Sequence, residues 1–267
     1  MIFNMITTWR NQRLLITLLL SMLNLILSEN YRSHSRIIMP RMIGGTPAEE
    51  GEVPFIMAIF HRGIFKGSFS LITTTTAVGA AHVIYHSLVI YIYGAVGNIN
   101  KYKGSLVFFK RKIIHLNYDP DTFENDIALL ILKKSIESTP TLYPVAVADR
   151  NQTYTSGYAT LAGWGRIGEN TTSDLQIAVV KLADPSSWLT HFKFPLKKTE
   201  IISRDWGISA MKGDSGSPLI RRNQFGRQIL IGVVSAMGQS TRVIIYMSTS
   251  FYHDFIKDNS EGEVTFL

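Results

Sequence analysis

The stretch MKGDSGSPL, residues 211–219, combines glycine, serine, aspartate and proline around Ser215. These residue types favour tight turns for local backbone reasons, so most such stretches are surface turns. The same glycines could instead bend the backbone sharply enough to expose a reactive hydroxyl. A serine hydroxyl is a weak nucleophile at neutral pH, so this chemical interpretation needs a nearby base and a third group that orients the base.

Two other residues fit those roles. Among seven histidines, His82 follows a strand-like run and the small residues GAA, which would let the backbone pack tightly and aim the imidazole. Asp126 begins the apolar run DIALLIL. A carboxylate entering a buried strand must be hydrogen-bonded or paired, because burying it alone is costly. Asp126 is therefore either the group that orients His82 or a residue that caps the strand.

The order along the chain separates two enzyme architectures. An α/β-hydrolase carries its nucleophile first, within G-x-S-x-G, and its histidine last. Here the order is His82, Asp126, Ser215, and Ser217 occupies the position of the final glycine. This order fits a two-barrel β protease.

The elements that would position these residues are mostly strands. Short apolar runs rich in β-branched and aromatic residues alternate with turn signals, without a βα pattern, an internal repeat or a linker after Arg41, and this predicts an all-β sandwich or barrel. The one convincing helix is terminal, with Ser250 as its N-cap and Phe251, Phe255 and Ile256 at helical spacing. The expected strands are residues 55–60, 68–78, 87–96, 105–116, 126–132, 158–164, 177–182, 228–236 and 242–248.

The N-terminus explains much of the formal charge of +7. Arg10 and Arg13 precede an apolar run at 14–27, which is short for a membrane span and typical of a secretory signal. An uncleaved membrane anchor is the alternative, because the expected cleavage point at Ser28 is not a clean A-x-A site. Beyond Arg41 the chain carries 22 basic and 19 acidic residues, which argues against a nucleic-acid partner. A remaining cluster of basic residues is expected to be a solvated strand pair rather than an anion-binding surface: Lys101, Lys103, Lys110, Arg111 and Lys112.

Cysteine is absent from all 267 residues. Disulfides and thiolate metal sites are therefore excluded, although an exported protein could normally use disulfides. The core alone must hold the chain together. We expect no metal and no cofactor.

Six motifs in order resemble the chymotrypsin-like serine proteases: RMIGG at 41–45, AAH ending at His82, NDIALL at 125–130, GWG at 163–165, GDSGSP around Ser215 and VVS ending at Ser235. The resemblance covers residues 41 to about 256. It implies an all-β fold of two packed six-stranded antiparallel Greek-key barrels with a short C-terminal helix. His82, Asp126 and Ser215 would be the catalytic triad, and the backbone N–H groups of Gly213 and Ser215 would form the oxyanion hole.

The resemblance also implies a zymogen. Cleavage after Arg41 would free the α-amino group of Met42, which would pair with Asp214 and order the oxyanion loop. The expected organisation is a signal peptide at 1–28, an activation propeptide at 29–41 and a peptidase domain at 42–267. The protein would be secreted, without stable membrane association, and cleaved by an activating trypsin-like protease.

The chain departs from the family in its disulfides and in its substrate pocket. Gly67 and Val83 replace the disulfide that normally lies beside the catalytic histidine. The resemblance assigns the substrate pocket to Ser209 at its floor, with Ser235, Met237 and Ile244 around it. Ser209 carries no charge for a basic substrate side chain, and two large side chains stand where glycine is usual. The pocket would be shallow and apolar, or closed.

Two functions follow. The first is a secreted serine endopeptidase that prefers small or medium apolar residues before the cleaved bond. Its partners would be polypeptide substrates and protein protease inhibitors. The alternative is a catalytically silent homologue that acts as a binding or decoy protein. Asn151 and Asn170 lie in N-x-T sequons and are candidate glycosylation sites in an exported chain.

Overall fold

A computed structural model describes residues 45–150, 152–167, 170–184, 197, 199–204, 213–238 and 243–267. The expected signal peptide and propeptide, together with Arg41, Met42, Asn151 and Ser209, lie outside the described residues. Within these ranges, no helix is long and apolar enough to cross a membrane.

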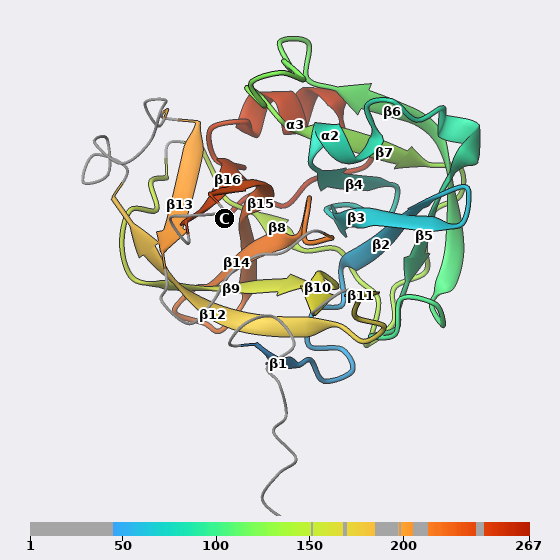
Figure 1. Ribbon diagram of the computed structural model, residues 1–267, viewed down its shortest axis with the longest axis horizontal. Helices are drawn as coiled ribbons and strands as arrows, with labels where there is room; N and C mark the ends of the chain where they lie inside the picture. The colour runs from blue at the N-terminus through green and yellow to red at the C-terminus, as the bar shows by residue number, and fades with distance from the viewer. Residues whose placement is uncertain are drawn as a thin grey trace, which may run out of the picture. The chain divides into compact units, whose positions relative to one another are not determined.

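The first half of the described chain forms a closed antiparallel barrel (Figure 1). Around the barrel the strands follow the order β2-β3-β4-β7-β6-β5. Arg62 and Gly63, with φ of 51° and 80°, form the two-residue connection between the first two strands, a backbone geometry that matches the strand twist. The strands are β2 (Ile56–His61), β3 (Ile64–Leu71), β4 (Thr76–Gly79), β5 (Ile92–Val96), β6 (Ser105–Ile114) and β7 (Ala128–Leu132).

The second half forms another closed barrel with the same winding. Its order is β9-β12-β13-β16-β15-β14, and pairing of β14 with β9 closes it. Both barrels therefore use their own six strands in the order 1-2-3-6-5-4. The strands are β9 (Tyr158–Gly163), β12 (Gln176–Ala183), β13 (Glu200–Arg204), β14 (Pro218–Arg222), β15 (Gln228–Gly238) and β16 (Val243–Ser248).

Short elements add to these barrels. β1 (Thr46–Pro47) pairs with β12, and β8 (Ala146–Val147) runs parallel to β15. β10 (Arg166–Ile167) and β11 (Asn170–Thr171) form a small hairpin. The predicted all-β, two-barrel architecture is confirmed. No internal sequence repeat accompanies this repeated strand order. Two segments can share a strand order when only their hydrophobic alternation is similar.

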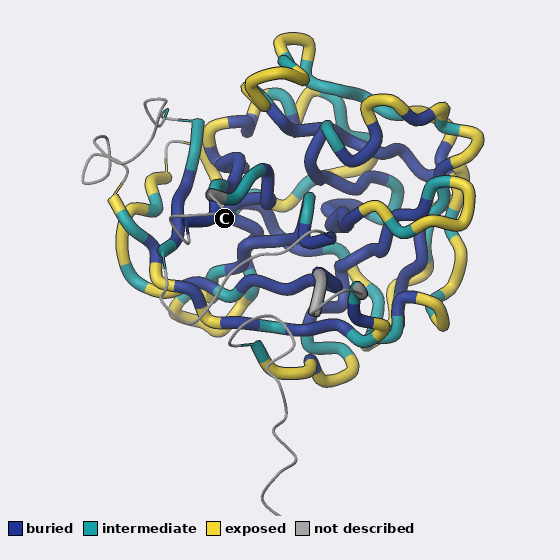
Figure 2. The backbone as a smooth tube through the Cα atoms, in the orientation of Figure 1, coloured by how far each residue is buried: buried dark blue, intermediate teal, exposed yellow. Residues whose placement is uncertain are grey.

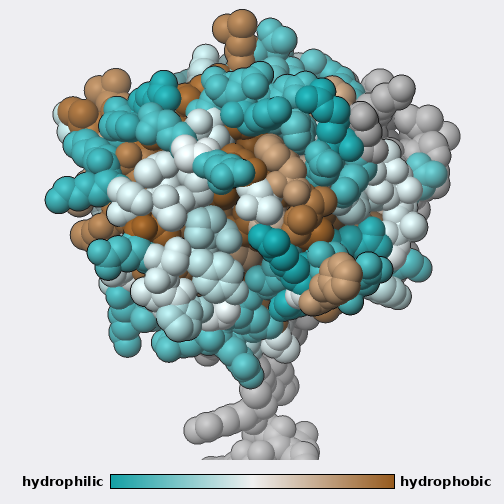
Figure 3. Space-filling view, turned by 180° about the vertical axis from the view of Figure 1, so that it is seen from behind, coloured by the Kyte–Doolittle hydropathy of each residue, from teal (hydrophilic) through white to brown (hydrophobic). Residues whose placement is uncertain are grey.

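The buried apolar side chains form two clusters, one around the first barrel and its contact with the second half, the other within the second barrel. Figure 2 shows that much of the strand backbone is buried. β12 illustrates the alternation: Ala178, Val180 and Leu182 are buried, whereas Val179 and Lys181 are exposed. Side chains of a strand alternate between faces, so one face closes the barrel and the other meets solvent. From behind, the surface shows hydrophobic patches scattered among a mainly hydrophilic exterior (Figure 3).

Several predicted elements were wrong in detail. The run 68–78 is not one strand, because the chain turns between β3 and β4. The Thr73 hydroxyl accepts the backbone N–H groups of Thr75 and Thr76 at 3.1 and 2.9 Å, and this local turn competes with strand formation. The run 87–96 begins with a short 3₁₀ helix, η1 (Val89–Tyr91). Strands β13 and β14 were missed.

The C-terminal helix α3 (His253–Asn259) is confirmed, but its predicted N-cap is wrong. Tyr252 occupies the N-cap position and makes no side-chain capping bond. The Ser250 hydroxyl instead accepts the backbone N–H of Gln152 at 2.8 Å. Phe255 packs against His115 of the first barrel with ring centroids 5.0 Å apart, so the helix connects the end of the chain back to that barrel.

Candidate active site

His82 lies on a single helical turn, α2 (Ala81–Ile84), that follows β4. Ala80, which precedes the turn, is fully buried. A Cβ placed on Gly79 would come within 2.5 Å of the Phe69 ring. The small residues therefore let the turn pack closely against the barrel, while the His82 side chain stays 22% exposed and open to a reaction partner.

Asp126 holds the imidazole from the buried side. Its side chain is fully buried, and its Oδ2 lies 2.7 Å from Nδ1 of His82. Oδ1 accepts the backbone N–H of His82 at 2.8 Å, and the Ser235 hydroxyl donates to Oδ2 at 2.6 Å. These bonds compensate the buried carboxylate. The Nδ1 contact requires the proton on Nδ1, which leaves Nε2 free to act as a base.

The residue before Asp126 supports this arrangement. Asn125 adopts φ of 54°, a conformation that asparagine tolerates better than most residues. Its side chain donates to the carbonyl of Asn117 at 2.8 Å and accepts from the Tyr252 hydroxyl at 3.0 Å. Tyr252 comes from the second half of the chain, so both halves of the protein position Asp126.

Ser215 lies in the turn that its glycines predict. Gly213 and Gly216 have φ of 106° and 75°, which residues with a Cβ rarely adopt. The Ser215 carbonyl accepts the backbone N–H of Ser68 in β3 at 2.8 Å. A Cβ on Gly216 would lie 2.2 Å from the Ser68 carbonyl oxygen and 3.2 Å from the nitrogen of Ala80. The turn from the second barrel thus rests against the strand and helix start that lead to His82.

Asp214 is buried behind this turn, at 1% exposure. Its Oδ1 accepts the backbone N–H of Gly165 at 2.9 Å. A Cβ on Gly163 would come within 2.3 Å of Oδ1, and one on Gly165 within 2.0 Å of Oδ2. The two glycines of the GWG motif therefore leave space for the carboxylate. Trp164 between them is buried and donates its indole N–H to the Ile99 carbonyl at 2.8 Å.

Two of the expected pocket residues are cross-strand neighbours in the second barrel. Met237 on β15 pairs across the sheet with Ile244 on β16. Ile244 is 2% exposed within the core of the second barrel, and Met237 packs against that core. Ser235 is buried and directed to Asp126. Side chains thus occupy both wall positions that the resemblance assigns to the pocket.

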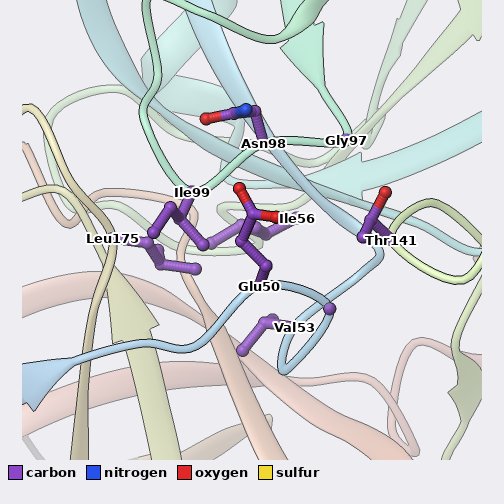
Figure 4. Close-up of a pocket in the computed structure, with 9 residues that line it drawn as sticks. Glu50, Val53, Ile56, Gly97, Asn98, Ile99, Thr141 and Leu175 are labelled. Carbon is purple, nitrogen blue, oxygen red and sulfur yellow. The ribbon is translucent and has the colours of Figure 1, made fainter.

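Two recesses lie elsewhere. One, of about 20 Å³, lies where Ile99 and Leu175 come together beside Glu50 (Figure 4). The other, of about 360 Å³, runs along β1, β12 and β14 and includes Glu52 and Arg222. Neither is lined by His82, Asp126 or Ser215.

The missing disulfide beside His82 has a simple replacement. A Cβ on Gly67 would lie 3.1 Å from Cγ2 of Val83, so the two positions are neighbours as the resemblance implies. The Val83 side chain is 7% exposed and fills the space against the bare Gly67 backbone. Packing therefore joins the His82 turn to β3 where a covalent bond is usual.

Lys112 makes a second connection to the His82 turn, and the sequence did not reveal it. Burial lowers the pKa of the Lys112 ammonium, which lies at the C-terminal end of α2. A cation there satisfies carbonyl groups that a helix end leaves without intrahelical partners. Lys112 Nζ donates to the carbonyls of Ile84, Tyr85 and Ser87 at 3.0, 2.7 and 2.8 Å.

The expectation of a solvated basic cluster holds for Lys103, Lys110 and Arg111, which are exposed, but is wrong for Lys101 and Lys112. Lys101 is 1% exposed. Lys110 and Arg111 pair with Glu261 at 2.6 and 3.1 Å. A charge count treats these residues alike, whereas the fold leaves Lys103 exposed, buries Lys101, pairs Lys110 and Arg111 with Glu261 and places Lys112 at the end of a helix.

Phe123 is another neighbour of His82 that sequence reasoning missed. Its ring meets the imidazole edge-on with centroids 5.3 Å apart, and its φ is 59°. The backbone of an aromatic residue with positive φ is strained, and strained residues cluster at functional sites. The short spacing between Phe123 and Asp126 was the only signal in the sequence.

Comparison with known proteins identifies the family. The family model "Trypsin" matches residues 42–256. Serine protease filzig of Drosophila melanogaster is 27% identical over 241 residues, covering 81% of this chain and 14% of that protein. Bovine coagulation factor XI is 27% identical over 245 residues, 84% of this chain and 39% of that protein. Collagenase of Hypoderma lineatum is 27% identical over 235 residues, 82% of this chain and 87% of that protein.

Two of these relatives are much longer than the aligned segment, so the chain spans only a part of filzig and of factor XI. The match nevertheless extends over most of this chain and coincides with the two barrels. The chain belongs to the trypsin family, the chymotrypsin-like serine proteases.

Proposed function

We propose that the protein is a serine endopeptidase with His82, Asp126 and Ser215 as its catalytic triad. The proposal rests on the two hydrogen bonds between Asp126 and His82. Oδ2 lies 2.7 Å from Nδ1, and Oδ1 lies 2.8 Å from the backbone nitrogen. A silent homologue has no need of a fully buried carboxylate that sets the histidine tautomer.

In this mechanism Ser215 Oγ forms a bond to the substrate carbonyl carbon while its proton passes to Nε2 of His82. The carbonyl electrons move to the oxygen, which the backbone N–H groups of Gly213 and Ser215 stabilise. Collapse of this intermediate breaks the carbon–nitrogen bond, and His82 returns the proton to the leaving amine. Water then repeats the sequence on the acyl-enzyme and releases the second product.

Activation would require cleavage between Arg41 and Met42. The freed α-ammonium of Met42 would bind Asp214, whose carboxylate is buried beside Gly165. An ion pair of this kind is incomplete until both charges exist, which makes the precursor a zymogen. Met42 replaces the usual isoleucine, and its flexible side chain would fit less tightly.

Export is proposed from the basic residues and apolar run at the N-terminus. The signal peptide would span 1–28 and the propeptide 29–41. An activating trypsin-like protease, polypeptide substrates and protein protease inhibitors are the partners that follow. At least one of Asn151 and Asn170 would carry a glycan in a eukaryotic host; Asn170 belongs to β11.

Specificity is proposed for small or medium apolar side chains. Ser209 would supply no charge for arginine or lysine, and burying an unpaired ammonium is costly. Met237 and Ile244, which are paired on neighbouring strands, would shorten the cavity. One observation favours the second candidate, a silent binding or decoy homologue: Ile244, which the resemblance assigns to the pocket, is almost fully buried.

Reaction with an organophosphonate serine probe separates the two candidates. After cleavage at Arg41, the peptidase should be labelled at Ser215, since labelling needs an activated nucleophile but little of the pocket. The Ser215→Ala variant is the matched control and should remain folded and unlabelled. Absence of labelling in correctly cleaved, folded wild-type protein would favour the silent homologue.

A further inference from the structure

Lys101 is a lysine in the protein interior. It belongs to the loop after β5, is 1% exposed and is among the largest fully buried side chains. Its ammonium lies 4.3 Å from the centroid of the Phe65 ring and 5.3 Å from that of Tyr102. Lysine is rarely buried without partners, so this position calls for a physical reason.

The ammonium links the two barrels. Lys101 Nζ donates to the Thr171 hydroxyl at 2.8 Å and to the carbonyl of Thr172. The backbone follows the same path: the N–H of Lys101 donates to the Ser173 carbonyl at 3.0 Å, and the Asn100 side chain donates to Asp174 at 2.8 Å. The loop from the first barrel is therefore fastened to the segment that leads from β11 to β12.

Two of the groups that the Lys101 ammonium contacts, Thr171 and Phe65, also lie beside Gly213. A Cβ on Gly213 would lie 3.0 Å from Cγ2 of Thr171 and 3.4 Å from Cε1 of Phe65. The third neighbour is the Cα of Gly165, at 3.3 Å. One ammonium thus fixes the hydroxyl of one wall residue and lies over the ring of another.

Burial and the nearby carboxylate of Asp214 both affect the charge of the Lys101 ammonium. Burial lowers the pKa of Lys101 to about 8, while the negative charge of Asp214 acts in the opposite direction. The lysine accordingly lies in the electric field of the carboxylate next to Ser215. The chain carries a cation of its own in this region, in addition to the α-ammonium that cleavage at Arg41 would supply.

We propose that Lys101 is a positioning residue of the oxyanion hole, which holds Thr171 and Phe65 against Gly213 so that the Gly213 peptide stays directed at the oxyanion. This inference rests on the proposed peptidase function, because it assigns the Gly213 N–H that role. Lys101 acts through its neighbours and does not touch the substrate.

The test compares Lys101→Met with Lys103→Met in Arg41-cleaved protein. Lys103 is an exposed residue of the same loop, so its variant controls for loss of one positive charge. The phosphonyl oxygen of the probe takes the place of the oxyanion. Lys101→Met should label Ser215 at least about tenfold more slowly, as small misplacements of catalytic groups cost rates of this order or more. On a peptide substrate, kcat should fall while KM stays near the wild-type value. Lys103→Met should match the wild type.

A second variant, Thr171→Val, tests the inference if Lys101→Met does not fold. Thr171→Val keeps the branched shape against Gly213 but removes the hydroxyl that accepts from Lys101, and it should also slow labelling. Equal labelling rates in the wild type and in the folded variant would overturn the inference. Hydrogen exchange in residues 213–217 gives a readout that does not need activity. If the wild type is never labelled, the peptidase proposal fails separately. Faster exchange in the variants would then still support the positioning role of Lys101. Unchanged exchange would overturn that role.

Discussion

Asp126 binds His82 with both carboxylate oxygens, one to the imidazole Nδ1 at 2.7 Å and one to the backbone N–H at 2.8 Å. The second bond fixes the helical turn itself, so the ring and the backbone that carries it are oriented by one buried group. Ser235 adds a bond from the second barrel at 2.6 Å. The relative position of the two barrels is thereby coupled to the orientation of the base.

Asp126→Asn should leave the protein folded and lower the rate on a peptide substrate by on the order of 10⁴, because the amide favours the wrong histidine tautomer. Steady-state kinetics on cleaved protein would measure this. Ser235→Ala, which removes one donor and leaves the tautomer unchanged, should have a much smaller effect. Comparable losses in the two variants would contradict the role assigned to Asp126.

Arg41→Gln should prevent activation by trypsin, since the α-amino group of Met42 would not be freed. Peptidase activity before and after trypsin treatment measures this, with N-terminal sequencing to establish the site cut. Asp214→Asn should be nearly inactive even when cut correctly, because the ammonium loses its buried partner. An Arg41→Gln precursor as active as the treated wild type would show that this cleavage is not the switch.

Lys112→Met should destabilise the protein by about 1–3 kcal/mol, because three carbonyls lose a charged donor. The loss acts at the end of α2, so activity should fall through poorer placement of His82. Urea unfolding and peptide kinetics would measure both. Lys133→Met, at an exposed position after β7, is the matched control and should change neither. An unchanged Lys112→Met variant would mean that water replaces the ammonium without cost.

The pH dependence of stability should reveal Lys101. Its folded pKa of about 8 lies below the ordinary value of 10.5, so the unfolded chain binds more protons between these values. The free energy of unfolding then rises with pH in that window, because the cost of burying the ammonium disappears as it loses its proton. The wild type should therefore gain stability relative to Lys101→Met between pH 7.5 and 9.5.

Measurements for this comparison should stop near pH 9.5. Burial raises the pKa values of Tyr246 and Tyr252 above the ordinary value of 10, so both contribute stability that is lost at higher pH. Urea unfolding at several pH values, with the difference between wild type and Lys101→Met plotted, removes their shared contribution. A difference that does not change with pH would show that Lys101 keeps its ordinary pKa.

The active enzyme should cleave after small and medium apolar residues and reject arginine and lysine. Selectivity among alanine, valine and leucine should be modest, since one methylene is worth about 1–3 kcal/mol in such a pocket. Replacing Met237 and Ile244 by glycine should admit phenylalanine and tyrosine. The loss of the buried Ile244 side chain should cost about 2–5 kcal/mol of stability.

Profiling with a peptide library measures these preferences. Dominant cleavage after arginine or lysine would show that Ser209 is not the floor of the pocket. Probe labelling at Ser215 without cleavage of any library peptide would indicate a closed pocket behind a working triad.

Local sequence patterns predicted the parts of this protein that depend on neighbouring residues. Alternation and β-branched content marked the runs that became β2, β7, β9, β12, β15 and β16. The glycines around Ser215 predicted a sharp turn, and its positive φ values follow directly from them. The missed strands β13 and β14 carry polar and charged residues at their ends, so their own sequence does not predict a strand. Pairing with neighbouring strands holds them in the extended conformation.

Sites built from residues far apart in the sequence were predicted only through the order of the motifs. The order His82, Asp126, Ser215 indicated a two-barrel protease, and the family match and the two barrels confirm that class. The sequence could not indicate that Tyr252 supports the residue before Asp126, or that Val83 fills the place of a disulfide. Such contacts join segments far apart in the chain, and side-chain types alone do not specify them.

By itself, then, the sequence determined the turn at Ser215, most strands and the family, because these depend on local backbone preference and on several short motifs in a set order. Only the tertiary structure decided the roles of the basic residues. Lys101 and Lys112 are indistinguishable from solvated lysines along the chain. Contact between the loop after β5 and the segment that follows β11 buries the first between Thr171 and Phe65. Folding of the first barrel brings the second to the end of α2, since the environment of a charged group is set by what folds around it.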